Sequence, residues 1–170
     1  PVATDGRYSV GTGVITDLQL LERRVTYAAT QSDAAAAETL RGGLELVRGP
    51  AFSYRNADRA SFVWVDLENL SVRAELVVTS AALKLGEICL SGGDSEGAVW
   101  AATRGLVASP AQTVLTELLM RAHALAGDRH ASERVYENHV NVLQALDLDE
   151  VAESTLDLHA EISRTVSAVG

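Results

Sequence analysis

Four histidines are the side chains in this sequence best suited to acid–base or metal chemistry: His123, His130, His139 and His159. A histidine can transfer protons near neutral pH or bind zinc through a ring nitrogen. His123 and His139 fall at helical positions that face a neighbouring helix, so we expect packed, neutral imidazoles and no zinc site. The only cysteine, Cys89, lies on an apolar helical stripe, which predicts a buried side chain and not a reactive thiol.

A cluster of carboxylates near the C-terminal end is the other candidate for metal binding: Asp147, Asp149, Glu150 and Glu153. It lacks the twelve-residue loop with a central glycine that calcium sites of this type use, so we expect a solvated turn before the last helix. The sequence also has no glycine-rich phosphate loop, no nucleophile elbow and no His-Glu-x-x-His pair. We therefore predict no catalytic residue, no metal, no cofactor and no enzyme activity.

Trp64 and Trp100 could together form a box for a ligand. Each lies on or beside an apolar helical stripe, so we expect both rings to serve packing within the core or between helices.

The composition predicts an all-α fold. The chain has 170 residues, which is enough for one domain with a sizeable core, and 47% of them are hydrophobic but only 5% aromatic. A core built from alanine, valine and leucine suits close packing of helices. Lysine occurs only at Lys84 and the other basic residues are arginine, a bias typical of high-GC bacteria.

The net charge of −9 argues against nucleic-acid binding by this segment, because binding to phosphate groups needs an excess of lysine and arginine. The same charge would repel anionic membranes. No run of apolar residues is long enough to cross a bilayer, and the start lacks the layout of a signal peptide. We expect a cytoplasmic location and no membrane contact.

Helical periodicity and stop signals predict about seven helices after a short extended lead-in at residues 1–15, where residues 7–10 could form a strand. Thr16 and Gln19 predict a capping box at the first helix, and Ser109, Pro110 and Gln112 predict another. Phe52 and Tyr54 are expected to pin the one long loop. The predicted helices span residues 16–32, 33–47, 64–91, 95–107, 109–126, 129–146 and a last segment that reaches residue 169.

A repeat organises the second half of the chain. The dipeptide Gly93-Asp94 recurs 34 residues later as Gly127-Asp128, and 34 residues is the period of tetratricopeptide repeats. In the first unit, Leu85-Gly86, Ala98 and Pro110 fit the spacing of that motif. The second unit is degenerate, since Met120 and Ser132 replace the small glycine and alanine. We therefore predict a tetratricopeptide-like α-solenoid.

Such arrays bind partners on the concave side, which is formed by the first helix of each pair. The repeat register predicts five partner-binding residues there: Leu83, Glu87, Val114, Glu117 and Arg121. The alternative for Glu117 and Arg121 is an ordinary ion pair within one helix, since four residues separate them.

The sequence also resembles the bacterial transcriptional activator domain of actinobacterial antibiotic-pathway regulators and related multidomain proteins. The resemblance covers residues 16–162 and rests on these segments: Arg48-Gly49-Pro50-Ala51-Phe52, Trp64, Glu68, Gly92-Gly93-Asp94, Arg104-Gly105-Leu106, Ser109-Pro110 and Leu119-Met120-Arg121-Ala122. It implies that residues 16–170 form this domain and that residues 1–15 are the remnant of an upstream winged-helix domain.

The resemblance implies a non-catalytic module for protein–protein interaction or oligomerisation in a bacterial transcriptional regulator. Its partner would be a second copy, giving a homodimer, or the transcription machinery. Two alternatives remain open at this point. One is a domain that senses a small molecule, and the other is an interaction domain of a membrane- or cell-wall-associated protein.

Overall fold

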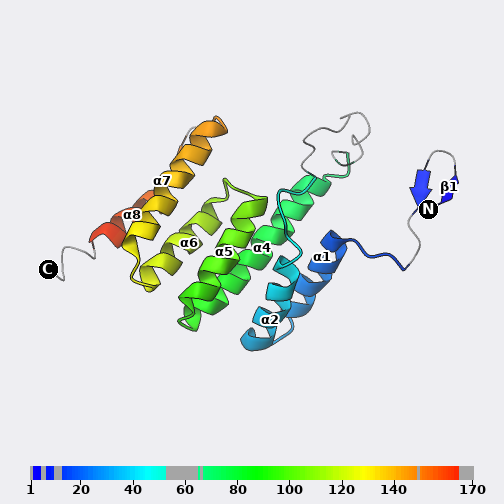
Figure 1. Ribbon diagram of the computed structural model, residues 1–170, viewed down its shortest axis with the longest axis horizontal. Coiled ribbons are helices and arrows are strands. Elements are labelled where there is room, and N and C mark those ends of the chain that lie inside the picture. Colours follow the sequence, from blue (N-terminus) through cyan, green and yellow to red (C-terminus); the bar gives the residue numbers. More distant parts are fainter. Residues whose placement is uncertain are drawn as a thin grey trace.

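The helices follow one another in sequence order across the molecule and form two layers (Figure 1). The computed structural model describes residues 2–4, 7–9, 13–52, 65, 67–148 and 150–164. One layer holds α1 (Asp17–Ala28), α4 (Leu70–Ser91), α6 (Thr113–Leu125) and α8 (Glu153–Arg164). The other layer holds α2 (Asp33–Leu44), α5 (Ser95–Ala108) and α7 (Arg129–Ala145). This arrangement confirms the prediction of an all-α, tetratricopeptide-like stack.

The first helix begins as its sequence predicts. The hydroxyl oxygen of Thr16 accepts a hydrogen bond from the Gln19 backbone, and the Gln19 side chain accepts one from the Thr16 backbone. Before this helix, β1 (Val2–Thr4) pairs antiparallel with β2 (Arg7–Ser9). The strand expected at residues 7–10 is thus present, and it has a partner strand that we did not predict.

The longest helix begins later than we predicted. Residues 64–91 were expected to form one helix, but a turn at Glu68 and Asn69 separates α4 from the residues before it. Asn69 has a φ of 52°, the left-handed region, which asparagine tolerates better than most residues and which a continuous helix cannot contain. Trp64 and Tyr54 lie outside the described residues.

The predicted capping box at Ser109 is wrong. Helix α6 begins at Thr113, and its N-cap, Gln112, makes no side-chain capping bond. The Gln112 backbone N–H instead donates to the Ser109 carbonyl, which closes a turn around Pro110. Proline suits the second position of such a turn as well as it suits a first helical turn, so the sequence pattern fits both structures.

The last two helices also differ in detail from the prediction. A helix was expected over residues 129–146, but α7 ends at Ala145, and Leu143 is buried whereas Leu146 is 55% exposed. In α8, Leu158 and Ile162 are partly covered. The end of the predicted last helix, residues 165–169, lies outside the described residues.

The two Gly-Asp turns are alike in their hydrogen bonds, which is the clearest structural evidence for the repeat. Gly93 and Gly127 both have positive φ, 76° and 77°, where a side chain would be strained. Each following aspartate caps the next helix: the Asp94 carboxylate accepts from the Gly97 backbone at 2.8 Å, and the Asp128 carboxylate accepts from the Ala131 backbone at 2.9 Å. The 34-residue period therefore corresponds to a structural period.

The core depends on small residues where α6 meets α4 and α5. A Cβ added at Gly86 of α4 would lie 3.0 Å from Leu118 Cγ and closer still to its methyl groups. A Cβ added at Gly105 of α5 would lie 2.8 Å from the Ala82 Cβ and also meet Leu115. Leu115 and Leu118 are fully buried in these gaps. The absence of two side chains thus lets α6 pack directly against the preceding helix pair.

We predict that Gly86→Leu lowers the free energy of unfolding by on the order of 3 kcal/mol, because the new side chain must displace Leu118 from a filled core. The urea midpoint measures this. Gly49→Leu is the matched control, since a Cβ there meets nothing within 4 Å, and it should change stability by less than about 0.5 kcal/mol. Equal midpoints for both variants would show that the α4–α6 contact is not tight.

Candidate functional site

The inner face is the side of α4 and α6 that no other described helix covers, and four of the five predicted partner-binding residues lie on it. Glu87 is exposed and Leu83 half-buried on α4, while Val114 and Arg121 are exposed on α6. The two helices pack against each other, so these residues occupy adjacent helices of one layer. The structure therefore brings the four together on one surface.

The inner face is more apolar than the sequence analysis recognised. Val72 is 55% exposed and Leu76 62% exposed on α4, while Val114 is 42% and Leu125 51% exposed on α6. Tyr27 of α1 is also largely exposed. The spacing of these residues in the sequence indicates a second apolar face on each helix, apart from the face that packs in the core. Leu76 and Leu83 are seven positions apart, and Val114 and Leu125 are eleven apart, so each pair lies on one side of its helix.

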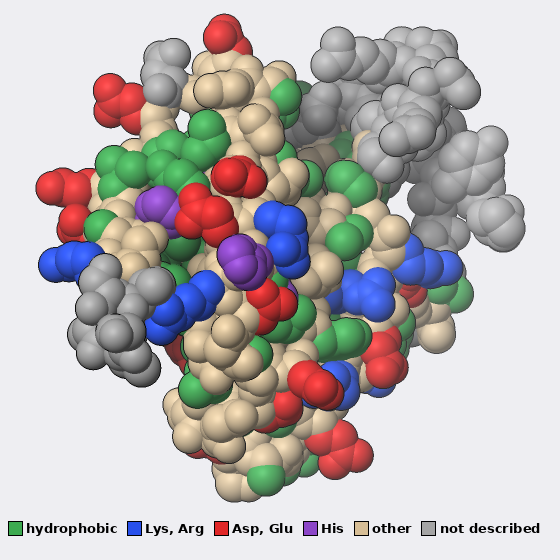
Figure 2. Space-filling view, turned by 60° about the vertical axis from the view of Figure 1, so that its left-hand side comes forward, with side chains coloured by type: hydrophobic (Ala, Val, Ile, Leu, Met, Phe, Trp, Pro, Cys, Tyr) green, Lys and Arg blue, Asp and Glu red, His purple; other side chains and the backbone are tan. Residues whose placement is uncertain are grey.

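Charged groups surround these apolar side chains. Arg73 of α4 forms an ion pair with Glu22 of α1 through two hydrogen bonds. In the described part of the chain, Arg23, Lys84 and Glu87 make no side-chain ion pair, so they are available to a partner. On the face toward α7 and α8, acidic and basic side chains are interspersed and no extended basic patch is visible (Figure 2).

Glu117 is the exception among the predicted partner-binding residues, because α8 covers it. The residue is only 7% exposed, and its carboxylate accepts hydrogen bonds from Ser154 Oγ at 2.6 Å and from Thr155 Oγ1 at 3.0 Å. Arg121 Nη2 lies 3.4 Å from the other carboxylate oxygen, so the alternative of an intrahelical pair is also present. The expectation that Glu117 is free to meet a partner is therefore corrected: it anchors α8.

A second buried polar contact joins α6 to α7. His139 of α7 is 2% exposed, and its Nδ1 lies 3.1 Å from Thr116 Oγ1 of α6. Burial lowers the pKa of His139, and the nearby Glu117 carboxylate opposes this shift. His139 is thus a packed, neutral imidazole at pH 7, as its repeat position predicts. Its Nε2 has no hydrogen-bond partner among the described residues.

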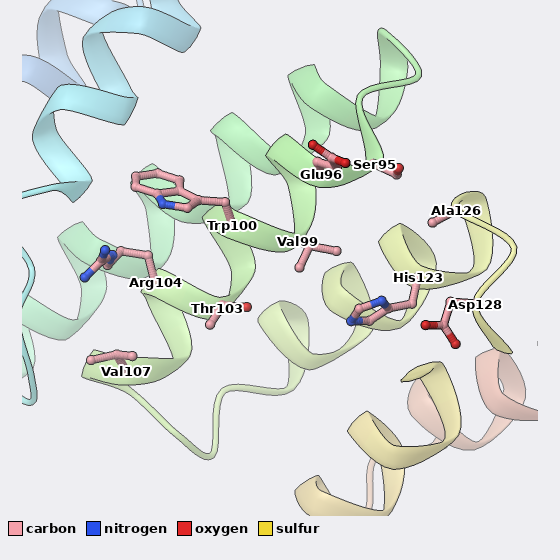
Figure 3. Close-up of a pocket in the computed structure, with 10 residues that line it drawn as sticks. All are labelled: Ser95, Glu96, Val99, Trp100, Thr103, Arg104, Val107, His123, Ala126 and Asp128. Atoms are coloured by element: carbon pink, nitrogen blue, oxygen red, sulfur yellow. The ribbon is translucent and has the colours of Figure 1, made fainter. Parts of the chain in front are cut away.

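The opposite side of the molecule holds a groove along α5, α6 and α7 that the sequence did not indicate. One cavity of about 660 Å³ follows the outer face of α5, and a second of about 290 Å³ lies between α5, α6 and α7. His123 lines both, so we treat them as one outer groove. Figure 3 shows Val99 and Thr103 of α5 pointing toward His123, whereas Trp100 and Arg104 point to the other side of that helix.

Trp100 packs between helices, as expected. Its ring lies under the guanidinium groups of Arg41 from α2 and Arg104 from α5, at 4.8 and 5.5 Å from the ring centre. Arg104 also donates a hydrogen bond to the Val47 carbonyl oxygen at 3.1 Å. These contacts join α2 to α5 by cation–π and hydrogen-bonding interactions.

The only cysteine, Cys89, lies in an unreactive setting. Burial is the main cause that raises the pKa of the Cys89 thiol, which keeps it protonated at neutral pH. Within the described ranges, no group of three or more His, Cys, Asp or Glu side chains could hold a metal ion. Among the helices that the structure describes, none is long and apolar enough to cross a membrane.

We predict that Glu117→Ala lowers the free energy of unfolding by about 1–3 kcal/mol, because it leaves the fully buried Thr155 hydroxyl without its acceptor. The matched control is Glu87→Ala, which removes an exposed carboxylate and should change stability by less than about 0.5 kcal/mol. Urea unfolding measures both. If the two variants unfold at the same urea concentration, Glu117 does not anchor α8.

The comparison with known proteins gives one match. The family model described as the bacterial transcriptional activator domain matches residues 16–163, which is most of the chain and includes α1, α2 and α4 to α7. No curated protein and no solved structure matches the chain. The match starts at Thr16, the residue that caps α1, so it agrees with the helical boundaries seen here. The chain therefore belongs to the bacterial transcriptional activator domain family.

Proposed function

We propose that this chain is a non-catalytic protein-interaction module of a bacterial transcriptional regulator and that it binds its partner on the inner face. The observation that carries this proposal is the set of large apolar side chains exposed on two packed helices: Val72, Leu76, Val114 and Leu125. Exposed apolar side chains gathered on one surface mark sites of association more often than chance exposure does. Helical repeats use this same surface for binding.

The polar residues around this surface would set the orientation of a partner. Arg121, Lys84 and Glu87 are exposed next to the apolar residues and could pair with charges of a partner at the rim. Such rim charges contribute mainly to specificity and association rate, whereas the apolar contacts contribute most of the affinity. Glu117 is not part of this surface while α8 covers it. The partner would be a second copy of the chain or a component of the transcription machinery.

We predict that this chain alone does not bind duplex DNA at micromolar concentration and physiological salt. Its net charge is −9, and binding depends on basic groups that neutralise phosphates. A gel-shift assay with mixed-sequence duplexes measures this. A retarded band that weakens steeply as salt is added would show that the chain has a phosphate-binding surface after all.

We predict that the double variant Leu76→Glu, Val114→Glu weakens association at least about tenfold while the chain stays folded, because both side chains are exposed and new charges would have to be buried in the complex. Sedimentation of the purified chain measures self-association, and binding to purified bacterial RNA polymerase tests the other partner.

The control for this experiment is Leu156→Glu, a single change at a similarly exposed leucine that belongs to α8 and to neither helix of the inner face. It should leave association within about twofold of the parent chain. Circular dichroism checks that all variants remain helical. Association that is equally strong in the inner-face variant, or absent from the parent chain with both partners, would refute the proposed function.

A further inference from the structure

The outer groove exists because one repeat position changes between the two units. Trp100 fills the space between α2 and α5, and these helices are in contact. The residue 34 positions later is Arg134, which lines the smaller cavity, and the backbones of α5 and α7 do not approach each other closely. A flexible, charged side chain cannot fill the volume of an indole in an apolar gap. The Trp100 ring fills the space between α2 and α5, whereas the corresponding space beside Arg134 of α7 is therefore open.

A second pair of repeat positions, which joins the two helices of each unit, also differs in size. In the first unit, Ala82 of α4 and Gly105 of α5 are in close contact. The residues 34 positions later are Thr116 and His139, which are larger and meet through a hydrogen bond. Both line the smaller cavity. A threonine–histidine pair holds the two helix axes farther apart than an alanine–glycine pair can.

The walls of the groove are apolar on two sides. Val99 and Leu106 come from α5, Leu119 from α6, and Val135 and Val142 from α7. Together the two cavities have the size of sites that take up small organic molecules, and such sites combine apolar walls with a few polar groups.

The polar groups of the groove favour a carboxylate. Arg134 is exposed on α7 and makes no ion pair or hydrogen bond within the described part of the chain. Asn138 lies one helical turn further on the same face, and both line the smaller cavity together with His123 and His139. An arginine binds a carboxylate through two parallel N–H donors, and an amide or imidazole N–H adds a further hydrogen bond.

The two acidic residues that line the groove lie at its other end. Glu96 and Asp128 line the larger cavity but not the smaller one, and the Asp128 carboxylate already caps α7. Asp128 precedes Arg134 by six residues, a rise of about 9 Å along the helix. A carboxylate bound at Arg134 would therefore be separated from these like charges.

We infer that the outer groove binds a small organic acid whose ring-sized apolar body takes the place that Trp100 has in the preceding unit and whose carboxylate pairs with Arg134. This site is separate from the inner face and does not depend on the proposed function. Nothing in it resembles a catalytic centre, since the acid is held by packing, one guanidinium and hydrogen bonds.

The probe for this inference is 2-naphthoate, whose carboxylate is ionised at pH 7, and the uncharged comparison is 2-naphthol, which has the same ring system. Calorimetry on the whole chain should show saturable binding of 2-naphthoate with a submillimolar Kd and binding of 2-naphthol at least about tenfold weaker. In NMR spectra, the ring signals of His123 and His139 should move on addition of 2-naphthoate. Those of His159 of α8, which stacks on Tyr136 of α7, should not move.

Two variants test the roles of charge and space. Arg134→Gln should weaken 2-naphthoate binding at least about tenfold, whereas Arg23→Gln, which removes an unpaired arginine from α1, should change it by less than about twofold. Arg134→Trp restores the residue of the first unit and should abolish binding without lowering the melting temperature, because the indole fills the groove.

Three results would each overturn the inference. The first is no saturable binding of 2-naphthoate in the millimolar range. The second is equal affinity for 2-naphthol, or for 2-naphthoate in the Arg134→Gln variant, which would mean that the carboxylate is not recognised. The third is a set of moved NMR signals that excludes His123 and His139. None of these results bears on the inner face, so the proposed function would stand or fall by its own experiment.

Discussion

The close approach of α6 to the α4–α5 pair is the constraint on which the rest of the structure depends. Leu118 sits where Gly86 has no side chain, and Leu115 sits where Gly105 has none. This contact sets the distance between successive units, and so it determines which sides of α4 and α6 remain uncovered. The inner face with its exposed leucines and valines is a direct consequence. A larger residue at either glycine would move both the core and this surface.

In the second unit, formed by α6 and α7, larger residues replace the small ones and polar contacts replace apolar ones. Met120 takes the repeat position of Gly86 and is fully buried, so α6 presents a larger side chain to its next neighbour. The junction with α7 and α8 is then made by the buried Glu117, His139 and Thr155. A buried polar junction is stable only if its groups are hydrogen-bonded, which ties the position of α8 to the Glu117 carboxylate. The two units thus have the same Gly-Asp turns but differ in how their helices pack.

The sequence allowed the fold to be predicted where a short pattern has one structural solution. Gly93-Asp94 and Gly127-Asp128 are of this kind, because a positive φ followed by a capping carboxylate ends one helix and starts the next. The pattern at Ser109 and Pro110 has two solutions, a cap or a turn, and only the tertiary structure decides. Glu117 was misjudged because α8 and α6 are far apart in sequence, and no local periodicity shows which helix will cover a given side.

The positions that differ between the units include buried positions and positions that line the surface. Trp100 corresponds to Arg134 in the outer groove, and Leu83 corresponds to Glu117 on the side of α6 that α8 covers. The residues that the period preserves, the turn glycines and capping aspartates, form the turns that connect the helices. Membership of the family therefore accounts for the architecture, whereas the specificity of each surface comes from side chains that the repeat leaves free to vary. Substitutions at these variable side chains, with the Gly-Asp turns unchanged, therefore test the function of each surface without altering the fold.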